Sequence, residues 1–160
     1  MQTQDVAKKL FLFFSLLLCM LALNTHVRAQ AKEEKSLYQR IGGYDAIAAV
    51  IDDFVPRLVG DPELGKFFAG HGNDSKQRIR QHVVELICQA SGGPCFYTGR
   101  SVKVAHAGLG ITEAQWQAAM GHLSATLDKF KLPEKEKNEL LALTTSLKPD
   151  IVAPVEGEKK

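Results

Sequence analysis

Two histidines in the middle of the chain are the residues best suited to metal chemistry. His106 lies in the short stretch "SVKVAHAGLGIT" (residues 101–112), which Gly108 and Gly110 close almost at once. His82 lies 24 positions earlier, on the apolar face of an expected helix. Neutral imidazole is a good ligand for iron, zinc and copper. If the chain brings the two segments face to face, these side chains could hold one metal between them.

A metal ion held by side chains alone would need three or four ligands with a recognisable spacing. The other candidates are His71, in a loop, and His122, beside the apolar row of a helix, and no third close ligand is apparent. Two opposed histidines fit a haem better, because the porphyrin supplies the other four iron ligands. The chain has no C-x-x-C-H attachment motif, so a b-type haem is expected. Either histidine taken alone is more simply a hydrogen-bonded core residue.

The start of the chain predicts an export signal over residues 1–29. Lys8 and Lys9 precede the apolar run Leu10–Leu23, which is shorter than a membrane span, and Ala29 offers a small residue for cleavage. We therefore expect an exported, periplasmic protein, with an uncleaved anchor as the alternative.

Removal of this segment makes the protein nearly neutral. The segment carries three of the 20 basic and one of the 18 acidic side chains, so 17 of each remain. We therefore expect no nucleic-acid partner, and no membrane partner once the signal is cleaved.

The remaining chain has the length of one domain. We expect this domain over residues 36–152, between disordered tails at 30–35 and 153–160. Cys88 and Cys95 flank the end of an expected helix, where an exported protein could form a disulfide. Two buried thiols are the alternative.

The periodic stretches of the sequence are all helical, which predicts an all-α fold. The first helix carries Ile47, Val50, Ile51, Phe54, Val55 and Leu58 on one face, contains Pro56, and ends in "GDPEL". A second helix is expected from about Ser75 to Ala90. A third begins with a capping box of Thr112 and Gln115. Pro133 opens a last helix, which carries Leu140, Leu141, Leu143 and Leu147.

From about Ser36 to Val152 the chain resembles the group I truncated haemoglobins. The matching pieces occur in order: "LYQRIGGYDAI", "DDF", "KFF", "GGPCFYTGR" and "VKVAHAGLGIT". The resemblance implies a two-over-two helical sandwich around haem. It also implies that His106 is the proximal iron ligand, carried on a helix of about one turn, which explains a histidine in so short a segment.

The resemblance also implies which other residues contact the cofactor. Phe68 corresponds to the phenylalanine that packs on the porphyrin, and Tyr97 and Lys103 lie near the rim, where a propionate could be met. Other side chains that should line or back the pocket are Phe54, Phe67, Leu86, Ile111 and Trp116. His82 shares a helix face with Leu86, and we expect it to be a distal haem ligand that swings away when gas binds.

The distal side departs from the family pattern. Val55 stands where the family commonly has tyrosine, and Ile79 and Val83 stand where glutamine is frequent. These aliphatic side chains of the distal pocket cannot hydrogen-bond a bound gas, so nitric-oxide dioxygenase activity is not expected.

Three functions stay open at this point. The first is a globin that reversibly binds oxygen, nitric oxide or carbon monoxide. The second is a bis-histidyl haem protein for electron transfer or redox sensing, with an unknown redox partner. The third is a haem-free helical interaction domain.

Overall fold

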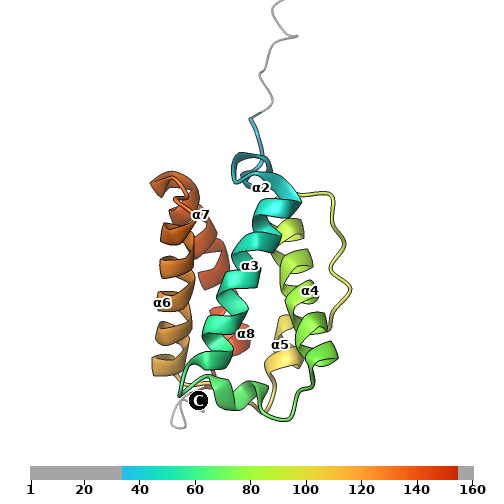
Figure 1. Ribbon diagram of the computed structural model, residues 1–160, viewed down its shortest axis with the longest axis vertical. Helices are drawn as coiled ribbons and strands as arrows, with labels where there is room; N and C mark the ends of the chain where they lie inside the picture. Colours follow the sequence, from blue (N-terminus) through green and yellow to red (C-terminus); the bar gives the residue numbers. More distant parts are fainter. Residues whose placement is uncertain (1–33, 155–160) are drawn as a thin grey trace, which may run out of the picture. The chain divides into compact units, whose positions relative to one another are not determined.

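The computed structural model describes residues 34–154, which form helices joined by short loops. Figure 1 shows their order: α2 (Leu37–Arg40), α3 (Gly43–Gly60), the 3-10 helix η2 (Gly65–Phe68), α4 (Asn73–Ala90), α5 (Val102–His106), α6 (Glu113–Lys129), α7 (Glu134–Thr145) and α8 (Lys148–Ile151). No strand occurs within these residues, so the all-α class is confirmed. The expected export signal, residues 1–29, lies outside the described residues.

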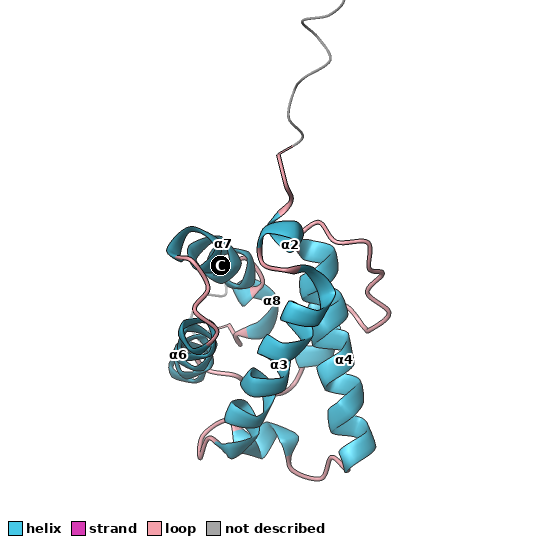
Figure 2. Cartoon of the chain, turned by 45° about the horizontal axis from the view of Figure 1, so that its top comes forward, coloured by secondary structure: helices cyan, strands magenta, loops and turns pink. Residues whose placement is uncertain are grey.

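Helix α3 is central and packs against α4 on one side and α6 on the other (Figures 1 and 2). Helix α7 packs against α6, so the long helices form two pairs, α3 with α4 and α6 with α7. The short α5 contacts α8 near the chain end. No helix within residues 34–154 has the length and apolar character needed to cross a membrane.

The core forms where the apolar faces of these four helices meet. Its buried members recur every three or four positions, as one face of a helix requires: Ile47, Ile51 and Val55 on α3, Val84, Ile87 and Cys88 on α4, Leu123 and Leu127 on α6, and Leu140 on α7. Burial of each large apolar side chain stabilises the fold by roughly 1.5–3 kcal/mol. The apolar helix faces that the periodicity predicts thus pack together in one core.

A polar contact fixes α3 against α6 beside this core. The Asp53 carboxylate accepts hydrogen bonds from Lys129, from Arg57 Nε at 2.7 Å and from the fully buried Thr126 hydroxyl at 3.2 Å. The Lys129 and Arg57 cations lower the pKa of Asp53 to about 2. Asp53 therefore stays ionised, and its charge is compensated from both helices.

The helix ends agree with the sequence in part. The predicted capping box is confirmed, since Thr112 N donates to Gln115 Oε1 at 3.0 Å and Gln115 N donates to Thr112 Oγ1 at 3.3 Å. The expectation of one unbroken last helix is wrong, because α7 ends at Thr145 and α8 begins at Lys148. Pro149 is the cause: it has no N–H, and its ring would clash with the carbonyl four residues earlier, at Thr145.

Candidate functional site

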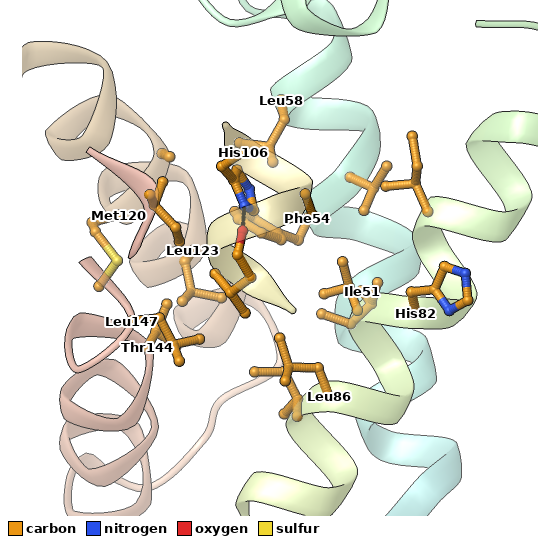
Figure 3. A pocket seen from close by; sticks show the side chains of 18 of the residues that line it. Ile51, Phe54, Leu58, His82, Leu86, His106, Met120, Leu123, Thr144 and Leu147 are labelled. Atoms are coloured by element: carbon orange, nitrogen blue, oxygen red, sulfur yellow. Dashed lines mark hydrogen bonds between the residues drawn. The ribbon is translucent and has the colours of Figure 1, made fainter. Parts of the chain in front are cut away.

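A cavity of about 580 Å³ lies among the helices, with a lining that is mainly apolar (Figure 3). Side chains from α3, η2, α4, α5, α6 and α7 line it. The lining includes all the predicted cofactor-contacting residues except Lys103: Phe54, Val55, Phe67, Phe68, Ile79, Val83, Leu86, Tyr97, Ile111 and Trp116. A cavity of this size and character can hold a large, mostly apolar ligand.

His106 lies at the end of α5, the five-residue helix. The Ser101 hydroxyl caps this helix by accepting a hydrogen bond from Val104 N, and Gly108 and Gly110 then adopt positive φ angles of 79° and 64°. Glycine tolerates this left-handed backbone, so the chain can turn away directly after the histidine. The short helix thus presents one imidazole at the cavity wall.

The tautomer of His106 follows from its hydrogen bond. Its Nδ1 lies 2.8 Å from the carbonyl oxygen of Val102, as the dashed line in Figure 3 shows. A carbonyl only accepts, so Nδ1 must carry the hydrogen, and Nε2 of the neutral ring keeps its lone pair. His106 also lines the cavity. It therefore presents an oriented imidazole nitrogen that could bind a metal in apolar surroundings.

His82 belongs to the lining of the same cavity, but its ring is turned away from His106 (Figure 3). The side chain is 39% exposed, and its ring meets that of Tyr97 edge-on, with centroids 6.0 Å apart. Its Nδ1 is buried, makes no hydrogen bond to any described residue, and lies 3.6 Å from Glu85 Oε2. Both histidines thus line one cavity, but their rings do not face each other.

Few of the polar side chains in the lining are free to bind a ligand. Tyr97 donates its hydroxyl to Arg100 O at 2.6 Å, Thr144 donates to Leu140 O at 2.9 Å, and Gln115 serves the capping box. The three positions singled out in the sequence, Val55, Ile79 and Val83, are aliphatic members of the lining. The part of the cavity wall formed by Val55, Ile79 and Val83 therefore offers a ligand little more than apolar contact.

Two basic residues of the lining were not predicted, and one predicted residue lies outside it. Arg100 and His71 line the cavity, whereas Lys103 is exposed and lies outside the lining. Helix α5 turns Val102 and His106 inward, and Lys103, one position after Val102, points elsewhere. The "YTGR" motif contained the missed signal, because Arg100 follows Tyr97 so closely.

The loop between α4 and α5 is held against α4 by a disulfide between Cys88 and Cys95, with Cα atoms 5.8 Å apart. Tyr97 N donates to Gln89 Oε1 at 2.9 Å, and Thr98 donates to Glu85 Oε2 from its backbone N at 3.1 Å and its hydroxyl at 2.8 Å. These bonds place the segment that leads into α5, and so they also help to place His106.

Glu85 is the main acceptor in this contact. Hydrogen bonds from Gln81 and Thr98 lower its pKa to about 2, and His82 contributes a smaller effect in the same direction. The carboxylate is thus ionised at any physiological pH. It is the only side chain among these ties that carries charge.

The chemistry of the cavity lining restricts the kind of ligand that it can hold. Within residues 34–154 no group of three or more His, Cys, Asp or Glu side chains could hold a bare metal ion. One oriented imidazole in a large apolar cavity instead suits a cofactor that brings most of its metal's ligands with it. Arg100 and His71 add basic groups at the same cavity, which fit a cofactor with acidic substituents. The residues present therefore fit a metalloporphyrin.

Comparison with known proteins supports the same kind of ligand. The model of the bacterial-like globins matches residues 36–153. A group 1 truncated haemoglobin of Mycolicibacterium paratuberculosis is 34% identical over 82% of this chain and 94% of its own length. Another, from a Nostoc species, is 32% identical over 71% of this chain and 93% of its own.

Solved structures share the fold. A truncated haemoglobin of Tetrahymena pyriformis in its Fe(III) form superposes with a TM-score of 0.68 at 22% identity, over 75% of this chain and all of that one. A truncated haemoglobin of Chlamydomonas reinhardtii gives 0.62 at 25% identity, over 78% of this chain and all of that one.

Proposed function

Because this chain belongs to the bacterial-like globin family, as a group 1 truncated haemoglobin, we propose that it reversibly binds a diatomic gas at a haem held by His106. The cofactor is haem, and we propose the b-type. When bound, haem would supply an iron that the porphyrin already holds with four ligands. A protein side chain would occupy a further position, and oxygen, nitric oxide or carbon monoxide could occupy another. Every other part of the function must come from the residues of the chain.

The observation that carries this proposal is the hydrogen bond from His106 Nδ1 to Val102 O. This bond fixes the ring orientation and leaves Nε2 as the ligand atom. A histidine placed only for packing has no need of an unpaired nitrogen at a large apolar cavity. The bond therefore supports a metal-binding role for His106 over a structural one.

The aliphatic distal wall determines what kind of gas binding we propose. Val55, Ile79 and Val83 are aliphatic and offer no hydrogen bond to a bound gas. Affinity would then depend on the iron and on access to it, with little help from polar contacts. For the same reason we do not propose nitric-oxide dioxygenase activity.

The second candidate is a bis-histidyl haem protein for electron transfer or redox sensing. His82 favours it, because this imidazole belongs to the same cavity lining as His106. Its outward orientation favours gas binding instead, since a ring turned away from His106 leaves the distal side to a ligand. We therefore rank gas binding first.

We also propose that residues 1–29 direct export of the globin to the periplasm. The Cys88–Cys95 disulfide supports this proposal, because such bonds persist in oxidising compartments. An electron donor able to reduce the iron would then have to reside in that compartment.

One absorption spectrum of the purified, haem-supplemented protein tests these functions against each other. A five-coordinate ferrous Soret band that shifts on addition of carbon monoxide is expected for gas binding. A sharp low-spin spectrum that resists carbon monoxide would favour the bis-histidyl protein. A folded sample with no Soret band would overturn both.

A further inference from the structure

We propose that Glu85 is a positioning residue that holds His82 in its outer orientation, turned away from His106, and so governs whether this imidazole turns toward the iron. The inference rests on the proposed function, because the cavity must hold haem for the position of His82 to matter. It goes beyond that function by identifying the group that competes with the iron for His82.

The outer orientation offers His82 a partner. Its buried Nδ1 lies 3.6 Å from Glu85 Oε2, just outside hydrogen-bonding distance, and has no other polar partner among the described residues. A shift of a few tenths of an ångström would let an Nδ1–H donate to the carboxylate. Tyr97 meets the ring edge-on and limits where it can move.

The inner orientation offers much less. The aliphatic side chains of Val55, Ile79 and Val83 line the cavity beside α4 and cannot hydrogen-bond an imidazole. A buried polar group without a partner is unfavourable, so only the iron could satisfy His82 there. The orientation of His82 is therefore a competition between Glu85 and the iron.

Glu85 suits this role because its carboxylate is fixed. Gln81 Nε2 donates to Oε1 at 3.1 Å, and Thr98 donates to Oε2 through its backbone N and its hydroxyl. Thr98 in turn belongs to the loop that the Cys88–Cys95 disulfide fastens to α4. The carboxylate cannot follow His82 into the cavity, so it favours the outer orientation only.

The test compares the haem-loaded wild type with Glu85→Gln, which keeps the shape of the side chain and removes its charge. A hydrogen bond to a charged acceptor is stronger than one to a neutral acceptor. We expect the ratio of inner to outer His82 to rise roughly tenfold. The ferrous spectrum should gain low-spin six-coordinate character, and a larger share of carbon monoxide binding should be slow.

Four further variants make the result specific. Glu136→Gln removes a carboxylate that pairs with Arg40 between α2 and α7, and should leave the spectrum unchanged. Thr98→Val removes one of the hydrogen bonds that fix the Glu85 carboxylate but keeps its charge, and should shift the spectrum in the same direction as Glu85→Gln, by less. His82→Leu should bind carbon monoxide in a single fast phase, and the double variant Glu85→Gln/His82→Leu should match it.

The haem-free protein gives an independent readout. Nitrogen chemical shifts of the His82 ring report its tautomer and hydrogen bonding, and Glu85→Gln should change them while Glu136→Gln should not. Unchanged His82 shifts in Glu85→Gln would overturn the inference, with or without haem.

The failures of the two proposals are distinguishable. If Glu85→Gln matches the wild type while His82→Leu differs from it, the inference about Glu85 is wrong and gas binding stands. If Thr98→Val shifts the spectrum as far as Glu85→Gln does, the loop contact and not the Glu85 charge is responsible, and the inference is also overturned. If no variant acquires a Soret band, gas binding fails, and the ring shifts alone decide the Glu85 contact.

Discussion

The Nδ1 atom of His106 lies 2.8 Å from the carbonyl oxygen of Val102, one helical turn earlier in the same five-residue helix. The donor and the acceptor both belong to α5, so the ring orientation is set locally. A ligand histidine held through its second nitrogen in this way has a defined tautomer and binds metal with little reorganisation.

His106→Gly is expected to lose most of its haem, because the variant lacks the imidazole that we propose binds the iron. Free imidazole added to the variant should restore much of the wild-type spectrum by occupying the vacated space. Haem content is measured from the Soret absorbance per protein. Unchanged haem content and an unchanged spectrum without imidazole would disprove the assignment.

Val83→Gln should slow oxygen release. The amide would place a hydrogen-bond donor in a cavity wall that is now aliphatic, and one such bond contributes about 0.5–1.5 kcal/mol, a few-fold to about tenfold in rate. Carbon monoxide release should change much less, since that ligand accepts hydrogen bonds weakly. Stopped-flow measurements with Val83→Leu as the control separate the polar effect from the change in size.

The exported protein should contain no free thiol when it is denatured without a reductant, because Cys88 and Cys95 are bonded. Cys88→Ala/Cys95→Ala should lower the free energy of unfolding by about 2–3 kcal/mol, the loop-closure entropy of so short a loop. Haem should also dissociate faster, since the loop leading into α5 loses its covalent tie. Two free thiols in the wild type would contradict the bond.

Asp53→Asn should destabilise the protein at neutral pH and less so in acid. The Lys129 and Arg57 cations lower the pKa of Asp53 from 3.8 to about 2 in the folded state. A lowered folded-state pKa stabilises the fold above the unfolded pKa, and this contribution disappears as the pH falls through the folded value. Urea denaturation of both proteins should therefore converge between pH 4 and pH 2.

N-terminal sequencing of the exported protein should begin at Gln30, directly after Ala29. Replacement of Ala29 by a bulky residue such as Phe should leave the precursor uncleaved, because the signal site requires small residues. Recovery of a full-length, haem-loaded protein in the cytoplasmic fraction of a native host would contradict the proposed export.

The sequence by itself determined the fold class and the helices that build it. The three- and four-residue spacing of Ile47, Ile51 and Val55 is a local property of the chain, and so is the capping box of Thr112 and Gln115. The break before α8 is also a local property, because Pro149 causes it, although the sequence interpretation overlooked this proline. Such features depend on neighbours within a few residues, and can be predicted without the fold.

The candidate site was predictable where a residue type and a local motif coincide. His106 stood out as a histidine in a glycine-closed turn, while its role as iron ligand and most of the cofactor contacts were implied by the family resemblance; the structure places these residues in the cavity lining. Lys103 lies outside the lining, and a five-residue helix gives too little periodicity to assign its inward face from the sequence. Arg100 lies in a loop and has no helical periodicity, so only its closeness to Tyr97 in the sequence could have indicated it.

Only the tertiary structure decided how His82 is oriented. Its position on an apolar face predicted a ring directed at the iron, and in the structure the side chain lines the cavity with its ring beside Glu85 and Tyr97. Tyr97 belongs to a loop that returns to α4 through the disulfide, and Glu85 is fixed by Thr98 of that loop. Helical spacing specifies a face to within one side chain's width, whereas the direction of a ring depends on partners that only folding brings together.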